Sequence, residues 1–150
     1  MGKLTQAGVI IAILGAVVAF IGLFPGVVGL EVLPGVGLLQ VLIVLIGFGL
    51  LFFGAYLFAQ SVYFPGIKHN LAQQIGIRLS MTGLVIAVAS GLSDILGFGS
   101  HPPIPPVQRP FLGSWQTAGL IGGFVLASFG LIIFVLMGPD GSNDEGGEKE

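Results

Sequence analysis

The segment RLSMTGLVIAVASGLSDILG, residues 78–97, indicates most clearly how this protein folds. It is apolar and long enough to cross a bilayer as a helix, yet it carries Arg78 near one end and Asp94 near the other. On a helix its small residues form one stripe, because they recur every three or four positions: Ser80, Gly83, Ala87, Ser90, Asp94 and Gly97. A stripe without bulky side chains allows a second helix to approach closely, and it turns Asp94 towards protein rather than lipid.

The composition of the whole chain indicates an integral membrane protein. Of its 150 residues, 54% are hydrophobic and 8% are charged, whereas soluble domains carry about 25% charged residues. The lipid bilayer is therefore the first expected partner. The five Lys and Arg residues are scattered and form no basic patch, so nucleic acid is not expected as a partner. The absence of cysteine excludes iron–sulfur clusters and thiolate zinc sites, and we expect no metal and no cofactor.

Four apolar segments are each long enough to span the membrane: 5–24, 36–59, 75–98 and 114–137. The sequence thus predicts an all-α membrane protein, with a four-helix transmembrane bundle over residues 1–137 and an acidic flexible tail over 138–150. Positive charges near the span ends set orientation. Lys3, Lys68 and Arg78 fall on one side and Arg109 on the other, so both termini are predicted to be cytoplasmic.

The first span carries a stripe of its own: Gly8, Ala12, Gly15, Ala19 and Gly22. When the sequence is aligned with itself at an offset of 75 residues, this stripe coincides with the stripe of the third span. At an offset of 76 residues the second span aligns with the fourth, and Gln40 matches Gln116. We therefore predict two pseudo-repeated antiparallel hairpins, repeat one at about 3–60 and repeat two at about 78–137. A chance resemblance is the alternative, because apolar segments draw on few residue types.

Asp94 is the main candidate for a buried polar or ion site, together with Ser90 and Ser93. A carboxylate at the bilayer centre costs about 2.5–3.5 kcal/mol and less near the interface, so such residues often have a function. There it could bind a cation, relay a proton or hold an Arg of a partner. The alternative is a buried acid that is hydrogen-bonded to the two serines or hydrated by water that enters from the loop side. Predicted interfacial anchors are Lys68, Arg78 and Trp115.

Few other residues of the chain are candidates for binding a cofactor or for catalysis. His69 and His101 fall in loops on opposite sides of the membrane, which argues against a bis-His haem within one chain but leaves a site shared with another subunit open. Four phenylalanines crowd the second span and are expected to face lipid or a partner helix, with a quinone or pigment surface as the alternative: Phe48, Phe52, Phe53 and Phe58. No pattern typical of a catalytic centre is present, so no enzyme activity is expected.

Two functions remain compatible with these patterns. The first is a non-catalytic accessory or structural subunit of a larger integral membrane complex, which contributes helix-packing surface to other membrane-protein subunits. The predicted packing seams are Gly8, Ala12, Gly15, Ala19, Gly22, Ser80, Gly83, Ala87 and Gly97. The alternative is a small oligomeric ion or proton transporter or channel that uses Asp94.

Overall fold

The computed structural model describes residues 2–29, 37–66, 69–98 and 112–138, and every regular element in these ranges is a helix. The long helices are α1 (Lys3–Leu23), α2 (Leu38–Tyr63), α3 (Leu71–Gly91) and α4 (Ser114–Leu136), and a short 3-10 helix, η1 (Pro25–Val28), follows α1. All four long helices have the length and apolar composition needed to cross a membrane. The prediction of an all-α protein with four helices long and apolar enough to span a membrane is confirmed.

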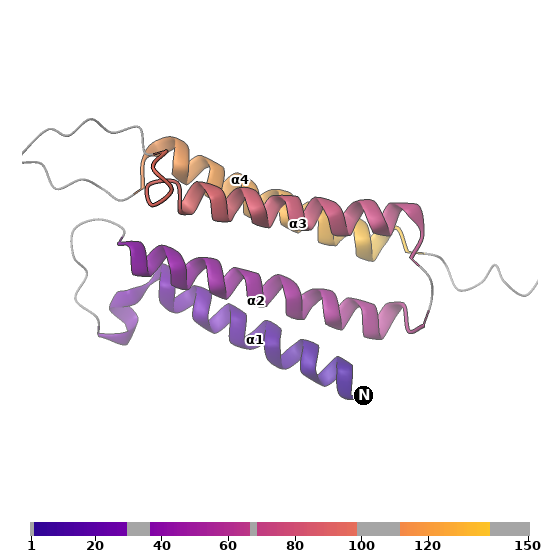
Figure 1. Ribbon diagram of the computed structural model, residues 1–150. Coiled ribbons are helices and arrows are strands. Elements are labelled where there is room, and N and C mark those ends of the chain that lie inside the picture. The colour runs from indigo at the N-terminus through magenta and orange to yellow at the C-terminus, as the bar shows by residue number, and fades with distance from the viewer. Residues whose placement is uncertain (1, 30–36, 67–68, 99–111, 139–150) are drawn as a thin grey trace, which may run out of the picture.

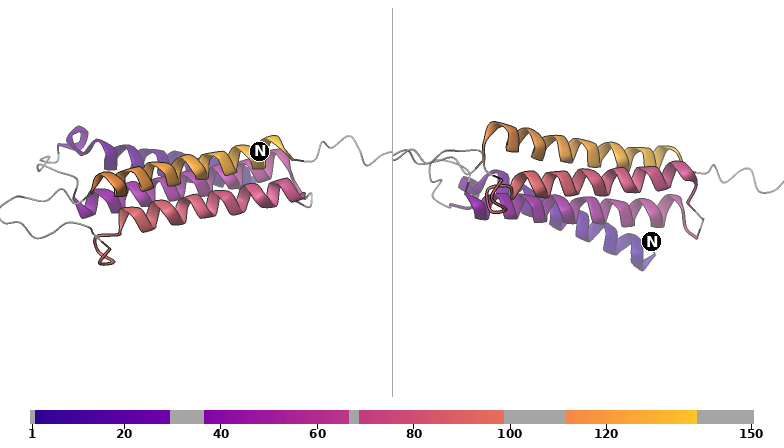
Figure 2. Two further views of the ribbon diagram at one scale, coloured as in Figure 1. Left: turned by 90° about the horizontal axis from the view of Figure 1, so that it is seen from above. Right: turned by 45° about the horizontal axis from the view of Figure 1, so that its top comes forward.

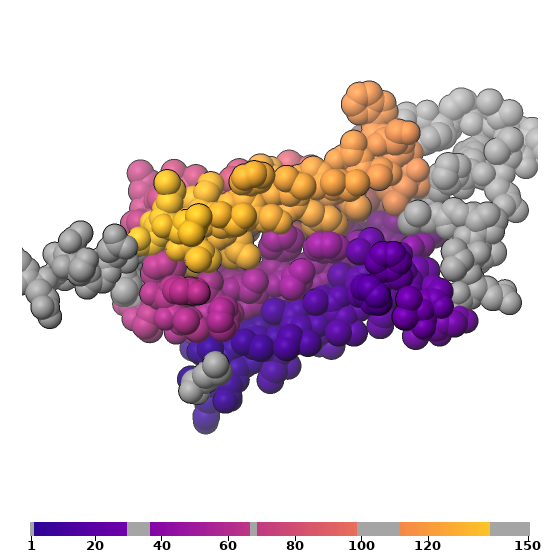
Figure 3. Space-filling model, turned by 180° about the vertical axis from the view of Figure 1, so that it is seen from behind, coloured from indigo at the N-terminus to yellow at the C-terminus, as the bar shows by residue number. Residues whose placement is uncertain are grey.

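The helices are arranged as two antiparallel pairs, α1 with α2 and α3 with α4 (Figure 1). Helix α2 lies between α1 and the second pair, and it makes most of the few contacts between the two hairpins (Figure 2). Seen from behind, α2 is visible as a band between α4 and α1 (Figure 3). The start of α1 and the end of α4 lie at the same end of the bundle, which is called the N-terminal end below.

Glycines close the first hairpin by bringing two backbones into contact. A Cβ atom added at Gly8 would lie 2.7 Å from the backbone nitrogen of Phe58, and one at Gly15 would lie 2.7 Å from the carbonyl oxygen of Gly47. These separations are below ordinary van der Waals contact, so only a hydrogen atom fits there. The predicted stripe of α1 therefore packs against α2. Ala12 and Ala19 continue it, lying against Gly54 and Gly47.

The second hairpin is closed in the same manner. A Cβ atom added at Gly76 would lie 2.6 Å from the carbonyl oxygen of Gly130, and Gly83 lies equally close to Gly123. The hydroxyl of Ser80 donates a hydrogen bond of 2.8 Å to the carbonyl oxygen of Ala127, which adds a polar contact to the seam. Ala87 is fully buried against α4. The two stripes thus face α2 and α4, each within its own hairpin, rather than each other.

The contacts relate α1 to α3 by an offset of 68 residues, not 75. Gly8 and Gly15 in the first seam take the places of Gly76 and Gly83 in the second. The same offset carries Lys3–Leu23 onto Leu71–Gly91, while the offset of 76 between α2 and α4 agrees with the contacts. The offset of 75 read from the sequence differs from this contact register by one heptad, because a stripe with steps of three and four superposes on itself after seven residues.

Helix α3 begins and ends earlier than the predicted span 75–98. It begins at Leu71 because Asn70 and Gln73 form a capping box, with Asn70 Oδ1 accepting from Gln73 N at 2.8 Å. It ends at Gly91, a poor helix former, and turns follow through Gly97. Asp94 therefore lies beyond the helix. The prediction that Gly97 extends the packing seam is wrong, because this residue is exposed with a φ of 82° and has no neighbour within 4 Å of its Cβ position.

The hairpins meet through two small apolar clusters. One joins α2 to α3 and α4 and consists of Val41, Val44, Leu45, Ala87 and Phe124. The other lies at the N-terminal end and consists of Ala59, Phe64 and Phe134. Most of the remaining large apolar side chains on the four helices are partly or largely exposed, as expected of a protein whose solvent is lipid.

Candidate functional site

The carboxylate of Asp94 is held at the start of α4. Gln116 Nε2 donates a hydrogen bond of 2.6 Å to Asp94 Oδ1, and Gln116 Oε1 accepts one of 2.6 Å from the backbone nitrogen of Gly113. Gln116 thus links the turn after α3 to the first turn of α4. The half-buried carboxylate also lies near the positive end of the α4 dipole, which stabilises negative charge.

The two serines take no part in binding this carboxylate. Ser93 Oγ donates to the carbonyl oxygen of Ser90 at 2.9 Å, and the side chain of Ser90 lies against Gly119 of α4. The predicted cluster of Asp94, Ser90 and Ser93 does not form, and the partner of Asp94 is Gln116. The spacing of Gly113 and Gln116 at a helix start could have indicated the local bond between these two residues, but not the bond from Gln116 to Asp94.

The predicted anchors lie in different surroundings. Arg78 is exposed on α3, two turns after the helix begins, and Trp115 is 87% exposed at the start of α4. Lys68 falls outside the described residues, as do His101 and the tail from residue 139 onwards. Gln40 is half-buried near the start of α2, and no hydrogen bond joins it to Gln116.

A polar cluster at the N-terminal end, which the sequence reasoning missed, joins α2, α3 and α4. His69 Nε2 lies 2.7 Å from Gln60 Oε1, and Gln60 Nε2 donates to the carbonyl oxygen of Phe64 at 3.2 Å. Asn70 Nδ2 donates to the carbonyl oxygen of Met137 at 2.6 Å, which binds the start of α3 to the end of α4. Gln73 is fully buried in the same region. The bonds to the carbonyl oxygens of Phe64 and Met137 satisfy helix termini, which is a structural role, whereas Nε2 of Gln73 has no partner among the described residues.

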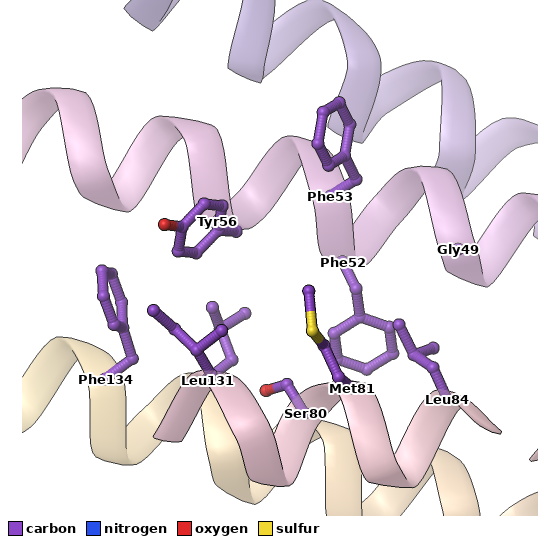
Figure 4. Close-up of a pocket in the computed structure, with 10 residues that line it drawn as sticks. Gly49, Phe52, Phe53, Tyr56, Ser80, Met81, Leu84, Leu131 and Phe134 are labelled. Carbon is purple, nitrogen blue, oxygen red and sulfur yellow. The ribbon is translucent and has the colours of Figure 1, made fainter. Parts of the chain in front are cut away.

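An apolar cavity of about 200 Å³ opens between the hairpins (Figure 4). Phe52 and Tyr56 of α2 point towards Met81 of α3 and Leu131 of α4, while Phe53 borders the cavity with its ring turned to the other side of α2. Of the other two phenylalanines of the predicted aromatic surface, Phe48 stacks on Phe124 with ring centroids 4.1 Å apart, and Phe58 is half-buried, with its backbone against Gly8. The cavity offers apolar contact and almost no polar group.

Among the described residues, no group of three or more His, Asp or Glu side chains is arranged to hold a metal ion. The polar groups gather at the two ends of the bundle, Asp94 with Gln116 at one and Gln60 with His69 at the other. The arrangement can therefore bind apolar groups between the hairpins and polar groups at the membrane boundaries.

No protein-family model matches this chain, and neither the curated proteins nor the solved structures yield a match.

Proposed function

We propose that this protein is a non-catalytic accessory or structural subunit of a larger integral membrane complex. The observation that carries the proposal is the contrast between the tight seams within each hairpin and the incomplete packing between them. The cavity of about 200 Å³ lies on this interface, and a second apolar cavity of about 270 Å³ lies between α2 and α4, with Leu23 of α1 at its edge. Apolar side chains of a partner helix would complete such packing.

The polar groups support the same role. The hydroxyls of Thr82 and Ser128 donate to carbonyl oxygens one turn earlier in their own helices, at 2.8 and 2.9 Å. Such bonds leave few free polar groups along the middle of the described helices. A path for ions or a catalytic group would need them, whereas a packing subunit does not.

The test is native electrophoresis of the protein extracted from its own membrane in mild detergent. Wild type is expected to migrate as a complex larger than a monomer. Gly49→Leu is expected to release the monomer, because Gly49 lines the cavity and has open space at its Cβ position. Gly122→Leu is the matched control, since Gly122 also has open space there but lies outside the cavity lining. A wild-type monomer, or equal behaviour of the two variants, would contradict the proposal.

Ion or proton transport by an oligomer is the second candidate, and it depends on Asp94. Among the described residues only Oδ1 of this carboxylate accepts a side-chain hydrogen bond, which leaves Oδ2 able to bind a cation or a proton. Asp94→Asn, measured for ion or proton flux in proteoliposomes, separates this role from a structural one.

We also infer that the hairpins arose by duplication and that both termini face the cytoplasm. The shared helix starts and seam glycines at offsets of 68 and 76 support duplication. The cytoplasmic assignment rests on Lys3 and Arg78, which belong to the N-terminal half of their spans. In intact cells, a cysteine introduced at the exposed Phe98 is then expected to react with an impermeant maleimide. Protection of that cysteine from the reagent would indicate the opposite orientation.

A further inference from the structure

A third cavity, of about 580 Å³, lies at the N-terminal end between the start of α1 and the end of α2. Gly2, Lys3 and Thr5 line it from α1, and Leu57 and Phe64 line it from the other side. No acidic residue contributes to the lining. It is separate from the Asp94 region, which lies at the opposite end of the bundle.

The start of α1 presents unpaired backbone donors to this cavity. Gly2 occupies the N-cap position and provides no side-chain cap. The amide of Gln6 bonds to the carbonyl of Gly2, so the amides of the preceding helical residues have no partner within the helix. Because α1 extends over 21 residues, its N-terminus also carries the positive end of a full helix dipole.

Thr5 is an independent indication of a ligand. The residue is only 6% exposed, it lines the cavity, and no hydrogen bond within the described chain involves its hydroxyl. By contrast, the hydroxyls of Thr82 and Thr117 donate to carbonyl oxygens four residues earlier, at 2.8 and 3.0 Å. Thr5 Oγ1 is not among the enclosed polar atoms of the described residues that lack a partner, so this hydroxyl is open to the cavity and can donate to a ligand that accepts hydrogen bonds.

At the corresponding position in the second hairpin, side chains of that hairpin cap the start of α3. An offset of 68 carries Gly2 onto Asn70 and Thr5 onto Gln73, the two residues that form the capping box of α3. Asn70 additionally binds the end of α4. The first hairpin lacks these groups, so the backbone amides at the start of α1 can donate hydrogen bonds to an external acceptor.

We propose that this cavity binds the phosphate of a phospholipid head group. Lys3 supplies a positive charge, while the free amides of α1 and the hydroxyl of Thr5 donate hydrogen bonds to phosphate oxygens. A lipid is the source because α1 begins to cross the membrane at this level and because Leu57 and Phe64 offer apolar contact to an acyl chain beside the donors. The site goes beyond the proposed function and does not depend on it.

The test is native mass spectrometry of the detergent-solubilised protein with added phosphatidylglycerol, diacylglycerol or glycerol 3-phosphate. Phosphatidylglycerol is expected to remain bound, whereas diacylglycerol lacks the phosphate and glycerol 3-phosphate lacks the acyl chains. Lys3→Gln is expected to weaken phosphatidylglycerol binding about tenfold, and Thr5→Val severalfold. Gly2→Asn is expected to weaken it as well, because it gives α1 the cap residue of α3 while keeping the charge of Lys3.

Arg78→Gln is the matched control, since it removes one positive charge from an exposed position on another helix. It is expected to leave phosphatidylglycerol binding unchanged. Equal binding of diacylglycerol, or an equal loss in Arg78→Gln and Lys3→Gln, would overturn the proposal. Tight binding of glycerol 3-phosphate alone would overturn the assignment to a lipid. Circular dichroism of each variant establishes that a loss of binding does not arise from unfolding.

Discussion

Gly15→Ala is expected to destabilise the protein by roughly 1–3 kcal/mol, the usual range for overpacking a close contact. The added methyl group would overlap the backbone of Leu51 and lie 2.7 Å from the carbonyl oxygen of Gly47, so α1 and α2 would have to separate. Because backbone atoms cannot rotate away, the seam can relieve the overlap only by moving a whole helix. The measurement is the free energy of unfolding in mixed micelles, followed by the fluorescence of Trp115 or by circular dichroism.

Gly49→Ala is the control for that experiment. Gly49 also lies within a helix of the first hairpin, but nothing lies within 4 Å of its Cβ position. Alanine is favoured over glycine in a helix by about 1 kcal/mol, so this variant is expected to be neutral or slightly more stable. Equal losses of stability in Gly15→Ala and Gly49→Ala would show that the seam is not a close backbone contact.

Gln116→Leu is expected to cost about 1–3 kcal/mol of stability, because it leaves the Asp94 carboxylate and the amide of Gly113 without their partners. Asp94→Asn is expected to cost less, under about 1 kcal/mol, since the amide oxygen of asparagine still accepts the bond from Gln116 Nε2. The measurement is again the free energy of unfolding in micelles. A larger loss in Asp94→Asn than in Gln116→Leu would contradict the structural role of this pair.

The same Asp94→Asn variant separates the two candidate functions. If the protein transports ions or protons through Asp94, the substitution is expected to abolish flux in proteoliposomes while the protein stays folded. Flux in wild type that persists in Asp94→Asn removes Asp94 from any transport mechanism. No flux in wild type supports the role as a subunit.

The sequence pattern predicted the packing faces well, but it did not predict how the helices of one hairpin correspond to those of the other. Gly15 and Gly83 lie at backbone contacts because small residues three and four apart must share a helix face, whatever the partner helix is. The same pattern could not distinguish an offset of 68 between α1 and α3 from one of 75, since the stripe repeats after seven residues. Gly76 was therefore left out of the seam, although it is buried against Gly130.

The end of α3 and the partner of Asp94 were also beyond sequence reasoning. Hydropathy continues through Ile95 and Leu96, although the helix stops at Gly91 and these two side chains are more than half exposed. The bond from Gln116 depends on how the start of α4 lies beside that turn, which is a property of the tertiary arrangement. The polar cluster of Gln60, His69 and Asn70 has the same origin, because it joins three helices.

Disulfide cross-linking in native membranes tests the helix pairing most directly, and the absence of native cysteine leaves no background. Ser90→Cys with Gly119→Cys is expected to cross-link α3 to α4, because the two Cβ positions are 2.9 Å apart and a small shift reaches the usual disulfide spacing of about 3.5–4.5 Å. Gly22→Cys with Ile43→Cys is expected to cross-link α1 to α2. Gly22→Cys with Ser90→Cys is expected to remain reduced. Efficient cross-linking of this last pair, with neither of the others formed, would show that the stripes of α1 and α3 pack on each other and would contradict the two-hairpin arrangement.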